Sequence, residues 1–421
     1  MTINEEKPRP LFSVVIPSRT RGDTLPFTIE SCLNQSQSGT FEWEVLVFDN
    51  ASEDDTATKI ALFNHPRIRY EKIGTPLCMA DSWETAIGLA RGEYIVLVGA
   101  DDALLPGCLA TLEVILRQHP GQVVSWATAG YHWPSSGEVQ KRNILQIPLG
   151  QTLRRLNSAS VLKAVLQFRI GYEMLPTFYN SCIPRTLIEE ARRATGRAIH
   201  ASAPDISSGM MFASLTKSYL YLNFPLSVAA TSGASNGASI LKMRDVGITA
   251  ETKAAREFLE LSAKAQMSFH ESLPQVPLLA VQIADAFIRA WSSLGRDPVG
   301  KVNMKAFKQN CYAELGYSSE PVKSEWAGIL ASYFKQTTPV EIAPAGKQHL
   351  RLGYNIKRQV MHLDMSNWGI KDACQAAAFS DKLVNPLAIV GDLEAMPPAR
   401  LSLGRKIKRV TRLLWDGEGE S

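Results

Sequence analysis

The chain has 421 residues, which is long enough for two domains of about 150 residues each or one large domain with an appendage. Apolar residues make up 45% of it and charged residues 20%, a globular composition that excludes a disordered or fibrous protein. The formal net charge is only +4, so the overall balance gives no reason to expect nucleic acid as a partner.

The cysteines and the apolar segments indicate the cellular compartment of the protein. The six cysteines lie far apart without a CxxC pair, which predicts reduced thiols and no zinc site. Residues 1–10 are charged and contain two prolines, so we expect a flexible N-terminus rather than a secretory signal. The most apolar long segment, 273–294, is interrupted by prolines and charges. These features predict a cytoplasmic protein that does not span a membrane.

Up to residue 127, short apolar runs alternate with segments of helical periodicity, a pattern typical of βα units around a mostly parallel sheet. The expected strands are Ser13–Pro17, Glu44–Asp49, Ile68–Tyr70, Tyr94–Val98 and Val123–Ala127. The expected helices are Asp23–Asn34, Ser52–Ile60, a helix around Trp83, Pro106–His119, Thr186–Ala194 and Ser208–Thr216.

The second half of the chain has a different composition. A small-residue stretch, TSGASNGAS at 231–239, predicts a loop, and helical periodicity dominates after it. We therefore expect an α/β domain over 11–232, a linker over 233–248, a mainly α-helical region over 249–395 and a tail over 396–421. Within the tail, residues 400–415 predict a basic amphipathic helix. Such a helix fits an anionic membrane surface, or docking on the protein through the same apolar stripe.

Acidic residues end two of the expected strands. Asp49 ends the second, and Asp101 and Asp102 end the fourth. Ligands of open α/β sheets bind beyond the carboxyl ends of the strands, and two adjacent carboxylates suit a hard divalent cation that also holds phosphate. The alternative is that Asp101 and Asp102 only cap the helix that begins at Pro106, and that Asp49 forms only a turn and cap.

Four segments taken together resemble a known family. SVVIPSR at 13–19, VLVFDNASEDDT at 45–56, ARGEYIVLVGADDALLPGCL at 90–109 and a later Asp205 are similar, in order and spacing, to the family 2 inverting glycosyltransferases. The resemblance covers about residues 11–230 and implies a GT-A fold, which is a Rossmann-like α/β domain. By this resemblance, Pro17, Ser18 and Arg19 border the base and ribose of a nucleotide, and Asp49 accepts a hydrogen bond from the base.

The resemblance also implies a metal site at the acidic pair. One of Asp101 and Asp102 would face the ribose and one would hold Mn²⁺ or Mg²⁺ on the diphosphate. Many members carry an acidic residue two positions before the second aspartate, whereas here Gly99 and Ala100 precede Asp101. Which aspartate takes which role therefore stays open.

An inverting transfer needs a base for the acceptor hydroxyl. The family takes it from an acidic residue that opens a helix after the sheet, which corresponds to Asp205 here. Members often have a Glu-Asp pair at this point, and this chain has Pro204 before Asp205. A plain helix cap is the alternative for Asp205, and His200 is a rival base.

These inferences predict a metal-assisted, inverting glycosyltransferase that uses a nucleotide diphosphate sugar and a glycan or lipid-linked glycan acceptor. One alternative is a sugar nucleotidyltransferase, although the loop PSRTRGDT after the first strand has a single glycine where those enzymes need a glycine-rich loop. Another is a relative that binds nucleotide sugars without turnover.

Overall fold

The structure, a computed structural model, describes residues 9–35, 41–235, 253–336, 342, 352–355 and 357–395. Its first sheet has eight strands in the order β3-β2-β1-β4-β10-β6-β11-β9, and β1, β2, β3 and β4 run parallel. The strands are β1 Phe12–Ser18, β2 Trp43–Asp49, β3 Ile68–Lys72, β4 Tyr94–Leu97, β6 Val124–Trp126, β9 Leu153–Asn157, β10 Ser181–Pro184 and β11 Ser218–Leu222.

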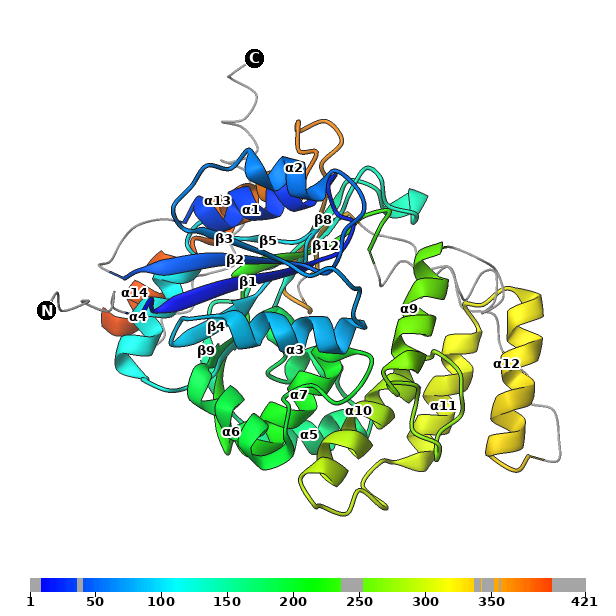
Figure 1. Cartoon of the computed structure of the whole chain (residues 1–421). Coiled ribbons are helices and arrows are strands. Elements are labelled where there is room, and N and C mark those ends of the chain that lie inside the picture. Colours follow the sequence, from blue (N-terminus) through cyan, green and yellow to red (C-terminus); the bar gives the residue numbers. More distant parts are fainter. Residues whose placement is uncertain are drawn as a thin grey trace, which may run out of the picture.

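Helices cover both faces of this sheet, which makes three layers (Figure 1). Figure 1 shows α1, α2 and α13 on one face and α3, α6 and α7 on the other. Because successive side chains of a strand point to opposite faces, Phe12, Val14 and Ile16 of β1 pack with α1, and Val15 packs with α3. The helices of this part are α1 Leu25–Leu33, α2 Thr56–Ala61, α3 Met79–Leu89, α4 Cys108–Gln118, α5 Ser158–Leu166, α6 Arg185–Thr195 and α7 Pro204–Leu215.

A second sheet has six strands in the order β13-β14-β8-β7-β12-β5. Its strands are β5 Ala103–Leu104, β7 Ala129–His132, β8 Ile144–Pro148, β12 Ser227–Thr231, β13 Gly353–Asn355 and β14 Val360–Asp364. Two helices follow β14, namely α13 Ala373–Val384 and α14 Pro386–Ala395. Buried residues of α13 belong to the same apolar cluster as those of α1 and β1. The late part of the chain thus completes the core of the early part.

Between β12 and β13, the described residues form four helices that extend to one side of the sheets (Figure 1): α9 Lys253–Lys264, α10 Leu279–Ser293, α11 Met304–Leu315 and α12 Glu320–Tyr333. Trp326 and Phe307 are fully buried in an apolar cluster of their own. α10 also packs on α7, where Trp291 Nε1 donates to Ser214 Oγ at 3.0 Å. The helices therefore lie against the same layer that carries Asp205.

The predicted fold class, an α/β domain with a mostly parallel sheet followed by a region with several helices, is confirmed. All five predicted strands are present. The N-caps of α1 and α2 are Thr24 and Asp55 rather than the predicted Asp23 and Ser52, and α7 begins at Pro204, earlier than predicted. The hairpin of β13 and β14 was not predicted, because its strands are short and only Met361 of β14 is buried, which leaves no alternating pattern.

Some predictions fall on other parts of the chain. Most of the predicted linker and the whole tail over 396–421 lie outside the described residues, so the membrane-surface helix stays a prediction. Within the described ranges, no helix combines the length and the apolarity needed to cross a bilayer.

Candidate active site

The carboxyl ends of β1, β2 and β4 meet at one edge of the first sheet. Ser18 at the end of β1 lies opposite Asp49 at the end of β2, and the Asn50 N–H donates to the Ser18 carbonyl at 2.8 Å. The segment after β4 carries Asp101 and Asp102. Because ligands bind beyond such strand ends, this edge is the candidate site.

Ser18 and Pro17 face this edge with different degrees of burial. Ser18 is buried, and its hydroxyl has no hydrogen-bond partner in the described parts of the chain. Pro17 is half-buried. A buried hydroxyl costs free energy unless a ligand or a water satisfies it. Ser18 therefore fits a position against a bound molecule.

Arg19 is used differently from a phosphate-binding arginine. Its Nη1 donates to the carbonyls of Asn50 and Ala51 at 2.6 and 2.8 Å, and its Nη2 forms an ion pair with Glu257 of α9. The guanidinium thus holds the loop after β2 in place and joins it to the helical region. Ala51 in that loop has a left-handed backbone, with φ of 57°, which such support keeps in place.

The carboxylate of Asp49 is fully buried and already has partners. Its Oδ1 accepts from the Ser52 N–H at 2.8 Å and its Oδ2 accepts from the Tyr70 hydroxyl at 2.5 Å. Lys72 Nζ lies 3.8 Å from Oδ2. The bond to Ser52 is the turn expected as an alternative role, and the bond to Tyr70 adds a second support that ties β2 to β3.

Asn50 was not predicted as a site residue. Its side chain pairs with the backbone of Leu77 in both directions, donating to the carbonyl at 2.9 Å and accepting from the N–H at 2.8 Å. Leu77 lies just before α3. One amide therefore fixes the start of α3 relative to the strand edge.

Asp101 is held through one oxygen only. Its Oδ2 accepts from Ser232 Oγ at 2.8 Å and from Ser235 Oγ. Its Oδ1 accepts no hydrogen bond from the described residues. Trp133 is buried, and its Nε1 donates to the Asp101 carbonyl at 3.0 Å. Asp101 is thus a fixed carboxylate with one oxygen available to a ligand.

Asp102 is held through both oxygens. Oδ1 accepts from the Ala230 N–H at 2.7 Å and Oδ2 from the Gly99 N–H at 3.1 Å. Burial raises the pKa of Asp102 well above its ordinary value, and the adjacent Asp101 raises it further. A Cβ on Gly99 would come 2.4 Å from Asp102 Oδ2, so position 99 needs glycine.

Neither aspartate caps the helix that follows. α4 begins at Cys108 with Gly107 as its N-cap, and the Gly107 N–H donates to Asp381 Oδ1 at 2.9 Å instead. The alternative interpretation of Asp101 and Asp102 as helix caps is therefore wrong.

Asp205 lies in the first turn of α7, after Pro204. The N-cap residue is Ala203, so Asp205 is not the plain N-cap of the alternative interpretation, although its carboxylate interacts with the first-turn N–H of Ile206. Its Oδ2 accepts from the Tyr172 hydroxyl at 3.0 Å. Burial raises the pKa of Asp205, and the Ile206 N–H and the Tyr172 hydroxyl partly offset the rise. This is a carboxylate held in one orientation with its pKa moved toward neutrality.

The charges of the acidic pair and of Asp205 all act on one side chain, that of Tyr179. Burial raises the pKa of Tyr179 well above its ordinary value, and the charges of Asp102, Asp101 and Asp205 raise it further, in that order. The structure therefore brings together three carboxylates that lie up to about a hundred positions apart in the sequence. Among the described residues, no histidine, cysteine, aspartate and glutamate side chains gather as a preformed metal cage of three or more ligands.

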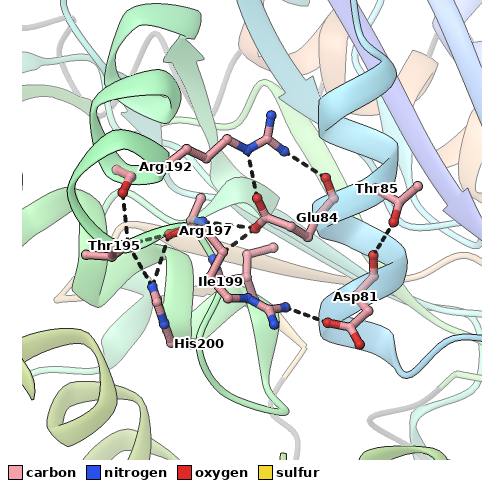
Figure 2. Close-up of polar contacts among 10 residues, drawn as sticks. Asp81, Glu84, Thr85, Arg192, Thr195, Arg197, Ile199 and His200 are labelled. Atoms are coloured by element: carbon pink, nitrogen blue, oxygen red, sulfur yellow. Dashed lines mark hydrogen bonds and ion pairs between the residues drawn. The ribbon is translucent and has the colours of Figure 1, made fainter. Parts of the chain in front are cut away.

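The loop before α7 is fixed by a charged network between α3 and α6 (Figure 2). Glu84 Oε2 of α3 accepts from the N–H groups of Ala198 and Ile199 at 3.0 and 3.1 Å. Glu84 Oε1 accepts from Arg192 Nε at 2.7 Å. Further along, Ser207 Oγ of α7 accepts from the His200 N–H at 2.8 Å. These contacts set where the helix of Asp205 begins.

His200, the rival base, is part of the same network (Figure 2). Its Nε2 lies 3.0 Å from both Thr195 Oγ1 and the Arg197 carbonyl. Because a carbonyl only accepts, the second contact is a hydrogen bond when Nε2 carries the proton. Burial lowers the pKa of His200, which favours this neutral form. The ring is therefore used to hold the loop.

We expect Glu84→Gln to lower the free energy of unfolding by about 1–3 kcal/mol, because glutamine has one acceptor oxygen and would set its NH₂ against donors of this network. Chemical denaturation followed by circular dichroism measures this change. Glu190→Gln, on the exposed side of α6, is the matched control and should stay within about 0.5 kcal/mol of wild type. Equal stabilities of the two variants would contradict the role given to Glu84.

The residues that sequence reasoning missed are Asn50, Tyr70, Glu84, Tyr172, Tyr179, Ser232 and Ser235. Ser232 and Ser235 belong to the small-residue stretch that was predicted as a loop. Their hydroxyl groups were the only feature of that stretch that could have indicated hydrogen bonds to an aspartate. The three tyrosines could not be predicted as site residues, because the sequence around them contains no motif that the sequence analysis used.

Comparisons with known proteins agree with this geometry. Residues 13–172 match the model of glycosyl transferase family 2. That range includes Pro17, Ser18, Arg19, Asp49, Asp101, Asp102 and Tyr172, and it ends before Tyr179 and Asp205.

Three curated relatives match parts of the chain. An Escherichia coli protein named as a UDP-Glc:α-D-GlcNAc-diphosphoundecaprenol β-1,3-glucosyltransferase is 32% identical over 92 residues, 22% of this chain and 35% of that protein. The abequosyltransferase of Salmonella typhimurium is 32% identical over 25% of this chain and 32% of its own length. An uncharacterized protein of Mycobacterium tuberculosis is 36% identical over 25% of this chain and 32% of its own. The chain thus spans about a third of the length of these relatives.

Among solved structures, residues 1–349 of TarS from S. aureus with UDP-GlcNAc align at a TM-score of 0.44 and 17% identity, covering 77% of this chain and 91% of that one. A mannosyltransferase from Pyrobaculum calidifontis with GDP-Man and Mn²⁺ aligns at a TM-score of 0.35 and 16% identity, covering 78% and 86%. Residues 13–172, which carry the strand-end aspartates, are therefore similar to glycosyl transferase family 2.

Proposed function

We propose that this chain transfers a sugar from a nucleotide diphosphate sugar to an acceptor hydroxyl, with inversion at the anomeric carbon. The observation that carries the proposal is the grouping of Asp101, which has one carboxylate oxygen without a partner among the described residues, with Asp205, whose pKa burial raises. The free oxygen of Asp101 suits the diphosphate of a donor and its cation, and Asp205 suits removal of the proton from the acceptor hydroxyl.

The Oδ1 atom of Asp101, which has no partner among the described residues, also fits a divalent cation. Mg²⁺ and Mn²⁺ commonly bind through one or two carboxylates and complete their shells with phosphate oxygens and water, so a preformed cage is not needed. Asp101 would hold the cation directly, and Asp102, with both oxygens bound to backbone N–H groups, would keep the turn in shape. When bound, the cation would neutralise charge on the departing diphosphate.

The protein's own residues supply the remaining roles. Ser18 and the loop held by Arg19 would border the nucleoside, since the Ser18 hydroxyl is buried without a partner among the described residues. Asp205 would accept the acceptor's proton while the acceptor oxygen bonds to the anomeric carbon and the bond from that carbon to the phosphate oxygen breaks. Tyr172 would keep the Asp205 carboxylate in orientation during this step.

The acceptor class is a further part of the proposal. The Escherichia coli relative is named for a diphosphoundecaprenol-linked GlcNAc acceptor. We propose a glycan or lipid-linked glycan hydroxyl as the acceptor for this chain, because transfer to such a molecule requires a base and a fixed donor and no further cofactor.

Turnover with a panel of nucleotide sugars and Mn²⁺ tests the proposed function. The expected products are a nucleoside diphosphate and a glycosylated acceptor or free sugar, identified by mass spectrometry. Pyrophosphate release would indicate nucleotidyl transfer instead. Binding without any product across acceptors would indicate a non-catalytic relative.

We expect Tyr172→Phe to move the acidic limb of the kcat/KM profile to higher pH. The Tyr172 hydrogen bond stabilises the ionised Asp205 and lowers its pKa, so its loss raises that pKa and leaves less base deprotonated at a given acidic pH. Tyr219→Phe is the control, because that hydroxyl donates to the Met174 carbonyl and to no carboxylate. Superimposable profiles for Tyr172→Phe and wild type would remove Asp205 from the role of base.

A further inference from the structure

Tyr179 lies on a segment with a well-fixed backbone. It belongs to the short 3-10 helix Phe178–Asn180 between α5 and β10. The Phe178 N–H donates to Ser208 Oγ of α7 at 3.2 Å, and Asn180 Nδ2 donates to the Trp126 carbonyl at 3.1 Å. The Phe178 ring also packs edge-on against Phe212, with centroids 5.0 Å apart. The position of Tyr179 is therefore set by both neighbours in the chain.

The ring of Tyr179 lies between α3 and the acidic pair. It packs edge-on against Trp83, with ring centroids 5.1 Å apart. A Cβ on Gly99 would come 3.0 Å from Tyr179 Cε1 and 2.4 Å from Asp102 Oδ2. Because Cε1 is bonded to the carbon that carries the hydroxyl, the phenolic end lies beside the Asp102 carboxylate. Asp205 and Tyr172 also act on it electrostatically.

The hydroxyl of Tyr179 differs from those of comparable tyrosines. The Tyr70, Tyr172 and Tyr219 hydroxyls donate to Asp49, Asp205 and the Met174 carbonyl. The Tyr179 hydroxyl donates to none of the residues that the structure describes, although the Asp102 carboxylate lies beside the ring and the charges of Asp101 and Asp205 also act on it. Tyr179 is half-buried, and a phenol with an ordinary pKa of about 10 carries its proton at neutral pH and can donate it to a ligand.

We propose that the Tyr179 hydroxyl donates a hydrogen bond to a hydroxyl of the sugar that is being transferred. The proposal rests on the proposed function, in which the diphosphate lies at Asp101 and the acceptor hydroxyl lies at Asp205. The transferred sugar is then the part of the donor between these groups, and the Tyr179 ring lies beside Asp102 while the charge of Asp205 acts on it. Tyr179 is thereby a specificity residue for the donor sugar.

Tyr179→Phe tests the proposal, because phenylalanine keeps the ring on Trp83 and removes only the hydroxyl. Calorimetry with a nucleotide sugar that wild type binds should show affinity weakened by roughly 5-fold to 100-fold, because a sugar hydroxyl loses its partner in a buried site. The matching nucleoside diphosphate, which has no sugar beyond the phosphates, should bind within about 2-fold of wild type, since it lacks the group concerned. The melting temperature should stay unchanged, because the hydroxyl has no partner among the described residues.

Tyr219→Phe is the matched control, since it also removes a hydroxyl from a tyrosine near the 171–180 segment. It should leave the ratio of the two affinities at its wild-type value. An equal loss for nucleotide sugar and nucleoside diphosphate in Tyr179→Phe would assign the hydroxyl to the phosphates and overturn the proposal. Unchanged affinity for both ligands would overturn it as well. Wild-type protein that binds no nucleotide sugar would instead reject the proposed function, and this inference with it.

Discussion

Asp205→Asn is expected to reduce transfer by about 100-fold to 10,000-fold, the range that a general base contributes, while donor binding stays nearly unchanged. Asparagine keeps the size of aspartate and can still accept from the Tyr172 hydroxyl, but it cannot take the proton of the acceptor. Steady-state kinetics with the natural acceptor, together with calorimetry of the donor, separates the two effects.

His200→Ala is the companion to this experiment. Since His200 holds the loop before α7 through its contacts with Thr195 and Arg197, its loss should lower stability and leave the shape of the pH profile unchanged. If Asp205→Asn kept near-normal turnover while His200→Ala lost it, the base would be His200. If both variants stayed active, the base would lie elsewhere in the chain.

Asp101→Asn is expected to remove the gain that Mn²⁺ brings to nucleoside diphosphate binding, with affinity falling by roughly 10-fold to 100-fold, as even the loss of a metal ligand's supporting partner does. Asparagine can still accept from Ser232 and Ser235, so the capping of this side chain survives. Calorimetry of the nucleoside diphosphate at several Mn²⁺ concentrations measures the effect.

Asp102→Ala is the contrasting variant. It leaves the N–H groups of Gly99 and Ala230 without their acceptors, and each unsatisfied group costs about 1–3 kcal/mol, so it should lower the free energy of unfolding. A full Mn²⁺ dependence in Asp101→Asn would show that the cation is held by other residues. A loss of that dependence in Asp102→Ala, with stability intact, would reverse the two roles.

The strands of the first sheet could be predicted because each is a short apolar run, and two of them end in aspartates whose positions follow directly from the strand register. What the sequence could not indicate is which distant groups meet these aspartates. Ser232 and Ser235 reach Asp101 across more than a hundred residues, and Glu84 reaches Ala198 across 114. Such contacts depend on the packing of whole elements, which leaves no local pattern.

For Asp205 too, the sequence pattern predicted the position in the chain, and only the packing of the structure showed the partner. Its place at the start of a helix was predicted, but the capping role was not distinguishable from a chemical one until Tyr172 was seen to hold the carboxylate. Arg19 was predicted at the right edge, yet its guanidinium pairs with Glu257 of α9, a partner that no property of the first 230 residues could indicate.

The position of β14 and α13 has a consequence for biosynthesis. A ribosome that has released residues 1–232 has not yet supplied the strand that pairs with β8, nor the helix that covers α1. Until the chain has emerged to about residue 384, the backbone edge of β8 and an apolar face of α1 have no cover, and both favour association with other chains. The nascent protein is therefore most exposed to aggregation and proteolysis while residues 233–384 are being synthesised, and a truncation placed after residue 232 would make that transient state permanent.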